Sequence, residues 1–243
     1  MHPKIKFEIK SKKDVETFFA FLRDSKYDNG RSFDWAVLKY HPFFKKFRTK
    51  SGFKIENEIV QKYVNDFYNE NKNIIKKNIN LYEKNWRKKE KIFYKLVNKL
   101  FPKDKWPKGQ YIAYATMWSM FPRFLEDKTF QIPHKYKDPK YVDAIIAHEM
   151  LHFIFYDYFY KNYPKYKTGK HNFLVWHVSE IFNVLVQNSD DWMKVFKIKS
   201  MAYPEHEKIV EKLEKKYKIM KLNKTDDLID DIIKTVKDSQ LMQ

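Results

Sequence analysis

The chain contains no cysteine among its 243 residues. Disulfide bonds, thiolate nucleophiles and cysteine-based zinc sites are therefore excluded, and the composition fits a reducing compartment. Long apolar runs are also lacking, since the longest, Leu151 to Tyr160, is interrupted by His152 and Asp157 and is too short to cross a bilayer. No apolar stretch follows the charged N-terminus, so no secretory signal is visible. We expect a soluble, cytoplasmic protein without a transmembrane segment.

Arginine is scarce although the chain is strongly basic. Only five of the 49 basic side chains are arginine, and the formal net charge is +18. Residues 1–109 carry 28 basic and 13 acidic side chains, a net charge of +15, whereas residues 110–243 have a net charge of +3. Arginine usually reads bases and clamps phosphates, whereas lysine acts as a point charge. The pattern predicts a diffuse positive surface on 1–109, either as ordinary lysine-rich composition or as a contact for an anionic partner.

The chain does have enough apolar residues for a core, at 43% hydrophobic and 18% aromatic. Its length corresponds to between one and two typical domains. The best boundary candidate is the segment 101–109, after which the sequence becomes less charged and richer in aromatic residues. We predict a basic, mostly helical N-terminal region over 1–109 and a second domain over 110–243.

Local patterns predict short strands together with helices. Strand-like stretches cover 4–9, 111–118 and 128–132. Helical periodicity covers a first helix from Asp14 to near Asn29-Gly30, two helices within 56–100 that break near Asn69–Asn73, and helices over 171–188, 204–220 and 225–238. Asp138-Pro139 has the pattern of a helix cap followed by proline at the first helical position, which predicts a helix to about Tyr160. The predicted fold class is α+β, with a small mixed sheet and a mainly helical remainder.

One motif in the helix after Pro139 carries chemistry. His148, Glu149 and His152 form a His-Glu-x-x-His sequence, and this composition would produce about 0.015 such motifs by chance. Histidines four residues apart lie on one face of a helix, so both rings can reach one metal ion at about 2.0–2.1 Å. Glu149 then lies beside the open coordination position, where it can take a proton from activated water. The motif predicts a Zn²⁺ site with Glu149 as general base.

The residues around the motif argue against a surface pair of histidines. The apolar run Ala144–Ala147 precedes it, and Leu151 and Phe153 continue it, so its polar side chains enter a buried helix. Burial of two imidazoles and a carboxylate without partners is costly. Metal coordination would supply the partner.

A third metal ligand is expected on the following helix. His177, Glu180 and Asn183 recur at steps of three within an aromatic and apolar face. Glu180 could ligate the ion, and Asn183 could hold the free ring nitrogen of His148 or His152. His177 could hydrogen-bond an oxyanion or a ligand, and a satisfied core histidine is an equally good interpretation of it.

Residues 144–153, Ala-Ile-Ile-Ala-His-Glu-Met-Leu-His-Phe, followed by Ser179-Glu180-Ile181-Phe182-Asn183, resemble the gluzincin branch of the zincin metallopeptidases, the thermolysin-like class. The resemblance covers about 110–190, one third of the chain. It implies a zincin-like fold and the hydrolysis of peptide bonds in a peptide or protein substrate.

The resemblance also implies roles for single residues. His148, His152 and Glu180 would be the zinc ligands and Glu149 the general base. Zincins place a sheet before the active-site helix, and the strand expected at 128–132 is in the place of the edge strand that pairs with extended substrate. Two features depart from the usual pattern: Val184 replaces an aspartate, and the spacing from His152 to Glu180, with 27 residues between them, is longer than usual.

Two alternatives remain. SprT-like proteases, which act on DNA-bound proteins, share the motif and use a third histidine, a part that His171 could play, although Asn172 stands where glycine is usual and the chain lacks a cysteine zinc ribbon. A non-catalytic basic binding protein with a structural zinc site is the other alternative, which the intact Glu149 disfavours. In the metallopeptidase interpretation, residues 1–109 could recruit substrate, cover the cleft as a pro-segment or serve as scaffold.

Overall fold

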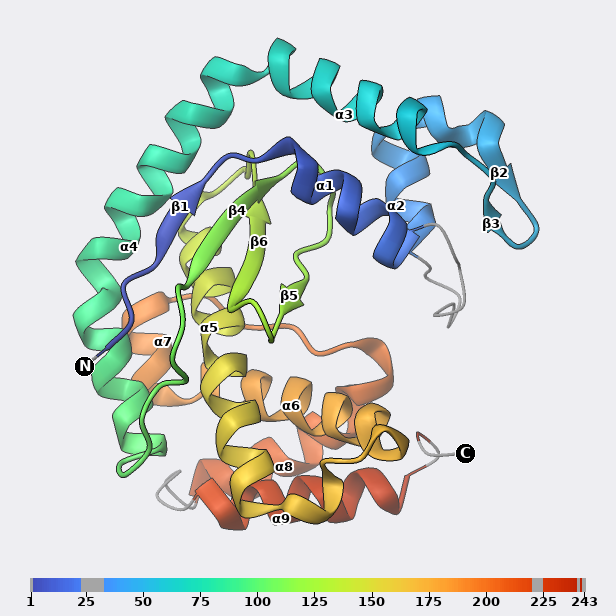
Figure 1. The fold of residues 1–243 in the computed structure, drawn as a ribbon. Coiled ribbons are helices and arrows are strands. Elements are labelled where there is room, and N and C mark those ends of the chain that lie inside the picture. The colour runs from blue at the N-terminus through green and yellow to red at the C-terminus, as the bar shows by residue number, and fades with distance from the viewer. Residues whose placement is uncertain (1, 23–32, 220–224, 240, 242–243) are drawn as a thin grey trace. The chain divides into compact units, whose positions relative to one another are not determined.

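The computed structural model describes residues 2–22, 33–219, 225–239 and 241. The fold is mixed α+β, about 67% helical, with a small mixed sheet. The chain divides into two compact units (Figure 1). The helical unit comprises Met1–Pro3, Asn85–Lys108 and Asp143–Gln243, and the sheet unit comprises Lys4–Lys84 and Gly109–Val142. Among the described helices, none combines the length and the apolarity that crossing a bilayer requires.

The elements follow this division, except that two long helices belong to both units. The sheet unit holds β1 (Lys6–Glu8), α1 (Ser11–Thr17), a π-helical turn (Phe18–Leu22), α2 (Phe33–Tyr40), a 3-10 helix (Pro42–Phe47), β2 (Arg48–Thr49), β3 (Gly52–Phe53), α3 (Asn57–Glu70), β4 (Ile112–Thr116), β5 (Arg123–Phe124) and β6 (Thr129–Pro133). The helical unit holds 3-10 turns at Pro164–Tyr166, Gly169–His171 and Pro204–His206, with α6 (Asn172–Gln187), α7 (Asp190–Phe196), α8 (Glu207–Ile219) and α9 (Thr225–Lys237). The shared helices are α4 (Lys72–Leu100) and α5 (Pro139–Asn162).

Most of the predicted elements are confirmed. The three strand-like stretches contain β1, β4 and β6, and the helical stretch over 56–100 breaks at Asn71, between α3 and α4. Asp138 caps α5, since its Oδ1 accepts a hydrogen bond from the backbone nitrogen of Lys140 at 2.9 Å. The helices α2 and α7, the strand β5 and the β2–β3 hairpin were not predicted. The helix end expected near Asn29-Gly30 lies outside the described residues.

The four-stranded sheet has the order β1-β4-β6-β5. β1 and β6 both run parallel to β4, and β5 pairs antiparallel with β6. The expectation of an edge strand at 128–132 is wrong. β6 pairs with β4 on one side and with β5 on the other, where Phe124 lies opposite Thr129. Both β4 and β6 are buried along their whole length.

One crossing between the two compact units, between Lys108 and Gly109, lies at the predicted boundary, although each unit takes segments from both predicted regions. The sheet takes β1 from the first 109 residues and its other strands from the remainder, and Lys6 N donates to Tyr111 O at 2.9 Å. Backbone pairing across about 105 residues of sequence therefore joins the two predicted regions into one layer.

A buried carboxylate organises the sheet unit. Asp14 of α1 accepts hydrogen bonds from Thr116 Oγ1 at 2.6 Å, and from Gln131 Nε2, Met117 N and Tyr68 Oη, each at 2.8 Å. These donors come from α3, from β4 and the residue after it, and from β6. Burial raises the pKa of Asp14 to about 6, although the four hydrogen bonds act in the opposite direction.

We expect a pH-dependent contribution of Asp14 to stability. Because its folded pKa of about 6 exceeds the ordinary value of 3.8, the contribution is fully present below the ordinary value and is lost as the pH rises through 6. Relative to Asp14→Asn, which does not titrate, the free energy of unfolding of the wild type should rise by about 2 kcal/mol between pH 7 and pH 4.5. Urea unfolding of both proteins at both pH values measures this, and a constant difference would contradict the prediction.

Candidate metal centre

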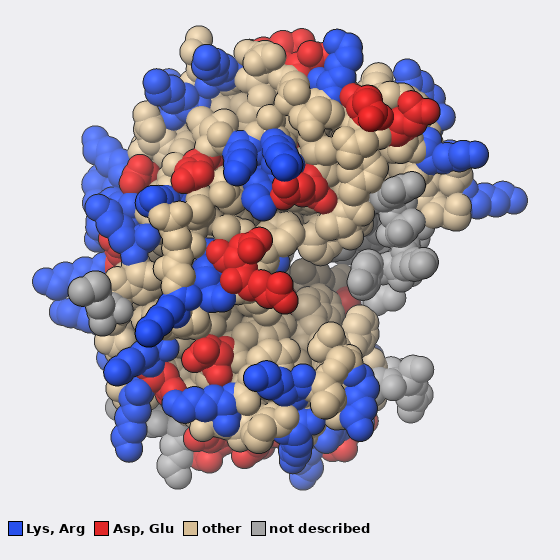
Figure 2. Space-filling view, in the orientation of Figure 1, with Lys and Arg blue, Asp and Glu red and all other residues tan. Residues whose placement is uncertain are grey.

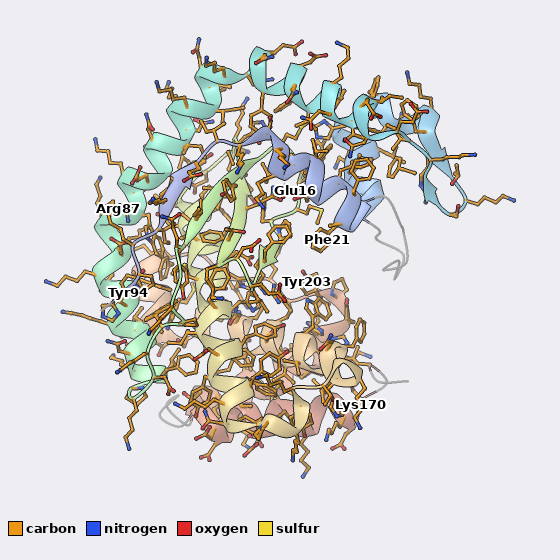
Figure 3. All side chains as sticks on the ribbon, in the orientation of Figure 1. Glu16, Phe21, Arg87, Tyr94, Lys170 and Tyr203 are labelled. Carbon is orange, nitrogen blue, oxygen red and sulfur yellow. The ribbon has the colours of Figure 1, made fainter. Side chains whose placement is uncertain are left out.

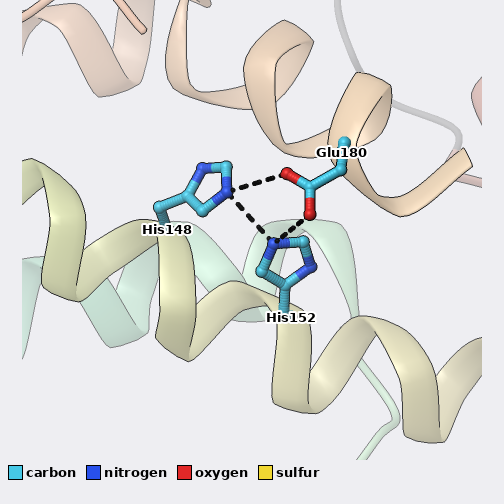
Figure 4. A group of neighbouring side chains, drawn as sticks. All are labelled: His148, His152 and Glu180. Atoms are coloured by element: carbon cyan, nitrogen blue, oxygen red, sulfur yellow. Dashed lines mark hydrogen bonds and ion pairs between the residues drawn. The ribbon is translucent and has the colours of Figure 1, made fainter. Parts of the chain in front are cut away.

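Three side chains from two helices of the helical unit converge at one point (Figure 4). His148 and His152 lie one turn apart on α5, and Glu180 lies on α6. Glu180 Oε2 is 3.2 Å from His148 Nε2, Glu180 Oε1 is 3.4 Å from His152 Nε2, and the two Nε2 atoms are 3.0 Å apart. Among the described residues, this is the group of histidine and acidic side chains that could hold a metal ion.

The spacing of the three ligand atoms fits a tetrahedral ion. Bonds of about 2.0–2.1 Å at tetrahedral angles place neighbouring ligand atoms about 3.3 Å apart. The observed separations of 3.0, 3.2 and 3.4 Å lie around this value. The side chains of His152 and Glu180 are buried, whereas that of His148 is 20% exposed. Two imidazoles and one carboxylate are the three protein ligands found in one class of catalytic zinc site.

A glutamine fixes the tautomer of His148. Gln187 Nε2 donates to the backbone oxygen of Ala144 at 3.0 Å, which leaves its Oε1 facing His148 Nδ1 at 2.8 Å. An amide oxygen only accepts, so Nδ1 carries the hydrogen and Nε2 presents its lone pair toward Glu180 and His152. Gln187 thus orients the imidazole as outer partners of metal-ligating histidines do.

Asn183 does not have the role expected of it. Its Nδ2 donates to the backbone oxygen of His148 at 3.0 Å, and not to an imidazole nitrogen. The ring nitrogen is held one turn further along α6, by Gln187. The cause is the geometry of the helix pair, which places Asn183 beside the α5 backbone. Asn183 therefore secures the helix that carries the histidines.

Glu149 is buried, with 6% of its surface exposed. Its charge, together with that of Glu180, acts on the neighbouring imidazole. Burial of His148 opposes protonation, but its hydrogen bond to Glu180, the charges of Glu149 and Glu180, and its hydrogen bond to Gln187 together raise its pKa. Carboxylates that favour a proton on this ring also favour a metal cation beside it.

His177 lies on α6 but outside the group of three. Its Nδ1 is 2.7 Å from Nε2 of His206, which ends the 3-10 turn Pro204–His206. Both side chains are buried. Burial lowers the pKa of both, that of His206 to about 4, so both imidazoles are neutral near pH 7. The structure therefore places His177 in a histidine pair one turn away from Glu180.

The alternative ligand His171 is not brought to the centre. It ends the 3-10 turn before α6, and its ring contacts that of Tyr166 with centroids 5.3 Å apart. Comparisons of this chain with protein-family models, with curated proteins and with solved structures find no match. Its function must therefore be inferred from the residues of the centre.

Sequence reasoning missed two residues near the centre. Gln187 follows Asn183 by four residues and Glu180 by seven, so the same helical periodicity that singled out Glu180 could have found it. His206 gives no such signal, because it reaches His177 from another element 29 residues along the chain.

The third ligand can be tested by zinc affinity. We expect Glu180→Ala to weaken zinc binding by more than about 100-fold, the upper end of what outer hydrogen-bond partners contribute, because an anionic ligand is lost from a set of three. His171→Ala is the matched control and should leave the affinity unchanged. Competition with a chromophoric chelator measures both variants. The reverse order would favour the SprT-like ligand set.

The role of Gln187 in orienting His148 can be tested in the same assay. Gln187→Leu removes the acceptor of the Nδ1 hydrogen and should lower zinc affinity by about 10–100-fold. Asn183→Ala should lower it less, because its amide contacts the α5 backbone and not the ring. Equal affinity of Gln187→Leu and the wild type would show that the tautomer is not controlled by Gln187.

Proposed function

We propose that this chain is a zinc-dependent metallopeptidase of the zincin type, with a gluzincin-like ligand set of His148, His152 and Glu180. The observation that supports this most directly is the convergence of Glu180 on the two histidines, with ligand atoms 3.0–3.4 Å apart. A His-Glu-x-x-His motif alone predicts two ligands. The carboxylate on a second helix completes the donor set of a catalytic zinc site.

Glu149 supports a catalytic function over a purely structural one. It follows the first histidine of the motif directly and lies close enough for its charge to raise the pKa of that imidazole. A structural site has no need of a buried carboxylate at this position, since burial of a charge is costly. We assign Glu149 as the general base.

The chemistry divides between the ion and the chain. When bound, zinc supplies a Lewis acid that makes a water molecule acidic at neutral pH. Glu149 accepts the proton of the attacking water and returns it to the leaving amine of the cleaved peptide bond. His148 and His152 would hold the ion as neutral ligands, Glu180 would contribute a negative charge, and Gln187 keeps His148 in the tautomer that ligation needs.

The basic surface does not favour a second function. On the face drawn in Figure 2, lysine and arginine side chains are scattered and acidic side chains lie between them. Several lysines are also ion-paired, such as Lys89 with Asp143 at 2.6 Å and Lys99 with Asp191 at 2.7 Å. We propose peptide or protein as the substrate and assign no nucleic-acid contact to this face.

The general base gives the decisive test. The wild type loaded with zinc should hydrolyse casein or a mixture of quenched fluorescent peptides, and Glu149→Gln should do so about 10²–10⁴-fold more slowly, because it keeps the shape of the side chain but cannot accept the proton. Elemental analysis should find one zinc per chain in both proteins.

A matched substitution on α8 controls for a general effect. Glu211 is exposed and lies outside the centre, so Glu211→Gln should keep the activity of the wild type. Unchanged turnover in Glu149→Gln, with zinc retained, would contradict the proposed mechanism.

A further inference from the structure

A platform of aromatic rings adjoins the candidate metal centre. Phe173 and Trp176 of α6 have ring centroids 5.8 Å apart, and Trp176 is 5.2 Å from Tyr203. Tyr203, labelled in Figure 3, comes from the segment that leads into α8. Phe173 is 51% and Tyr203 43% exposed. We call these three side chains the aromatic platform.

The platform is unusual within its own unit. Four large apolar side chains are exposed among the described residues of the helical unit. Two of them, Phe173 and Tyr203, belong to the platform, a third, Met201, precedes Tyr203 by two residues, and the fourth, Ile92, lies on α4. Exposed apolar surface that gathers at one place marks a binding site more often than scattered exposure does.

The platform continues the face of α6 that carries the metal ligand. Trp176 precedes Glu180 by four residues and therefore lies one turn away on the same face of the helix. On α5, Tyr156 borders the same region, because its ring is 6.1 Å from that of His152 and its hydroxyl accepts a hydrogen bond from Ser179 at 3.1 Å. A chain bound at the metal centre would pass the platform within one helical turn.

The histidine pair packs against the platform and has unused hydrogen-bonding capacity. The ring of His177 is 4.6 Å from Phe173, and that of His206 is 5.5 Å from Trp176. His177 Nε2 and His206 Nδ1 are buried and have no hydrogen-bond partner among the described residues. Buried polar atoms are nearly always partnered in native proteins, so orphaned ones call for a partner such as a bound water, an ion or a ligand.

The pair offers one donor and one acceptor. Two neutral imidazoles share one hydrogen between His177 Nδ1 and His206 Nε2. If His177 donates it, His177 Nε2 is an acceptor and His206 Nδ1 carries a hydrogen, and if His206 donates it, the roles are reversed. In the first arrangement His177 Nε2 can accept a hydrogen bond from a peptide N–H, and in the second it can donate one to a peptide C=O.

We propose that the aromatic platform and the His177–His206 pair form a substrate subsite, in which the rings hold a large apolar side chain of an extended peptide and His177 hydrogen-bonds its backbone. This inference rests on the proposed peptidase function and names its substrate class. The rings present no charge to a bound side chain, so a phenylalanine is favoured over a glutamate in the same place.

The subsite can be tested by binding alone, without hydrolysis. The probes are acetylated and amidated Ala-Ala-Phe-Ala-Ala, and the same peptide with alanine or glutamate in the centre. Each is titrated by calorimetry into zinc-loaded Glu149→Gln, which lacks the general base. We expect the phenylalanine peptide to bind at least about 10-fold more tightly than the alanine peptide, as burial of an aromatic side chain implies.

Substitutions separate the two parts of the subsite. Trp176→Ala should abolish the preference for phenylalanine. Phe173→Ala, at a more exposed position, should reduce this preference, and it replaces Trp176→Ala in the test if that variant does not fold. His177→Phe should weaken all three peptides by a similar factor of about 2–10, because a backbone hydrogen bond is lost. Ile92→Ala, an exposed apolar residue on α4, is the control and should change nothing.

The outcomes distinguish this inference from the proposed function. Equal affinities for the three peptides, or a phenylalanine preference that survives both ring substitutions, overturn the subsite even if the wild type hydrolyses peptides. If Phe173→Ala instead changes self-association in sedimentation while peptide affinities stay equal, the platform is covered by a second copy and the subsite is wrong. A preference that depends on Trp176 supports the subsite even if the wild type hydrolyses none of these peptides.

Discussion

The candidate centre depends on the polar contacts between α5 and α6. Near the start of α5, Ala144 contacts Gln187 at the end of α6, and further along α5, Tyr156 contacts Ser179 nearer the start of α6. The two helices are therefore antiparallel, and both are largely buried in apolar surroundings. In such a seam a polar group is tolerated only with a partner. The amides of Gln187 and Asn183 bond to the backbone of α5 and thereby set the register that brings Glu180 to the histidines.

Asp14 and Glu180, two of the buried carboxylates, are stabilised in different ways. Asp14 accepts hydrogen bonds from four groups of the protein itself, so it needs no cation. Glu180 faces Nε2 of His148, which presents a lone pair once Nδ1 has donated to Gln187. Two hydrogen-bond acceptors that face one another across about 3 Å repel each other. A cation between them, either a proton or a metal ion, removes this repulsion. The raised pKa of His148 expresses the same demand for positive charge at this point.

Local patterns were sufficient for most of the helices and for the candidate ligands that lie on them. The cap at Asp138, the break at Asn71 and the choice of Glu180 all follow from spacings of a few residues, which the sequence displays directly. What could not be predicted depends on contacts between distant segments. The pairing of β1 with β4 and the contact of His206 with His177 are set by tertiary packing and leave no local signal.

The long separation of His152 and Glu180 has a simple structural origin. α5 continues ten residues beyond His152, α6 begins eight residues before Glu180, and nine residues, 163–171, join them. At 1.5 Å per residue, both helices extend about 12–15 Å past the centre, so the hairpin is lengthened without displacing the ligands.

This extension of the hairpin carries the rings that distinguish the region. On its inner side Phe155 and Phe159 are fully buried, whereas Phe173 remains half exposed on the first turn of α6. A shorter hairpin would still bring His148, His152 and Glu180 together, but it would lack Phe173 and Trp176. The added length therefore places these rings beside the candidate centre and leaves the positions of His148, His152 and Glu180 unchanged.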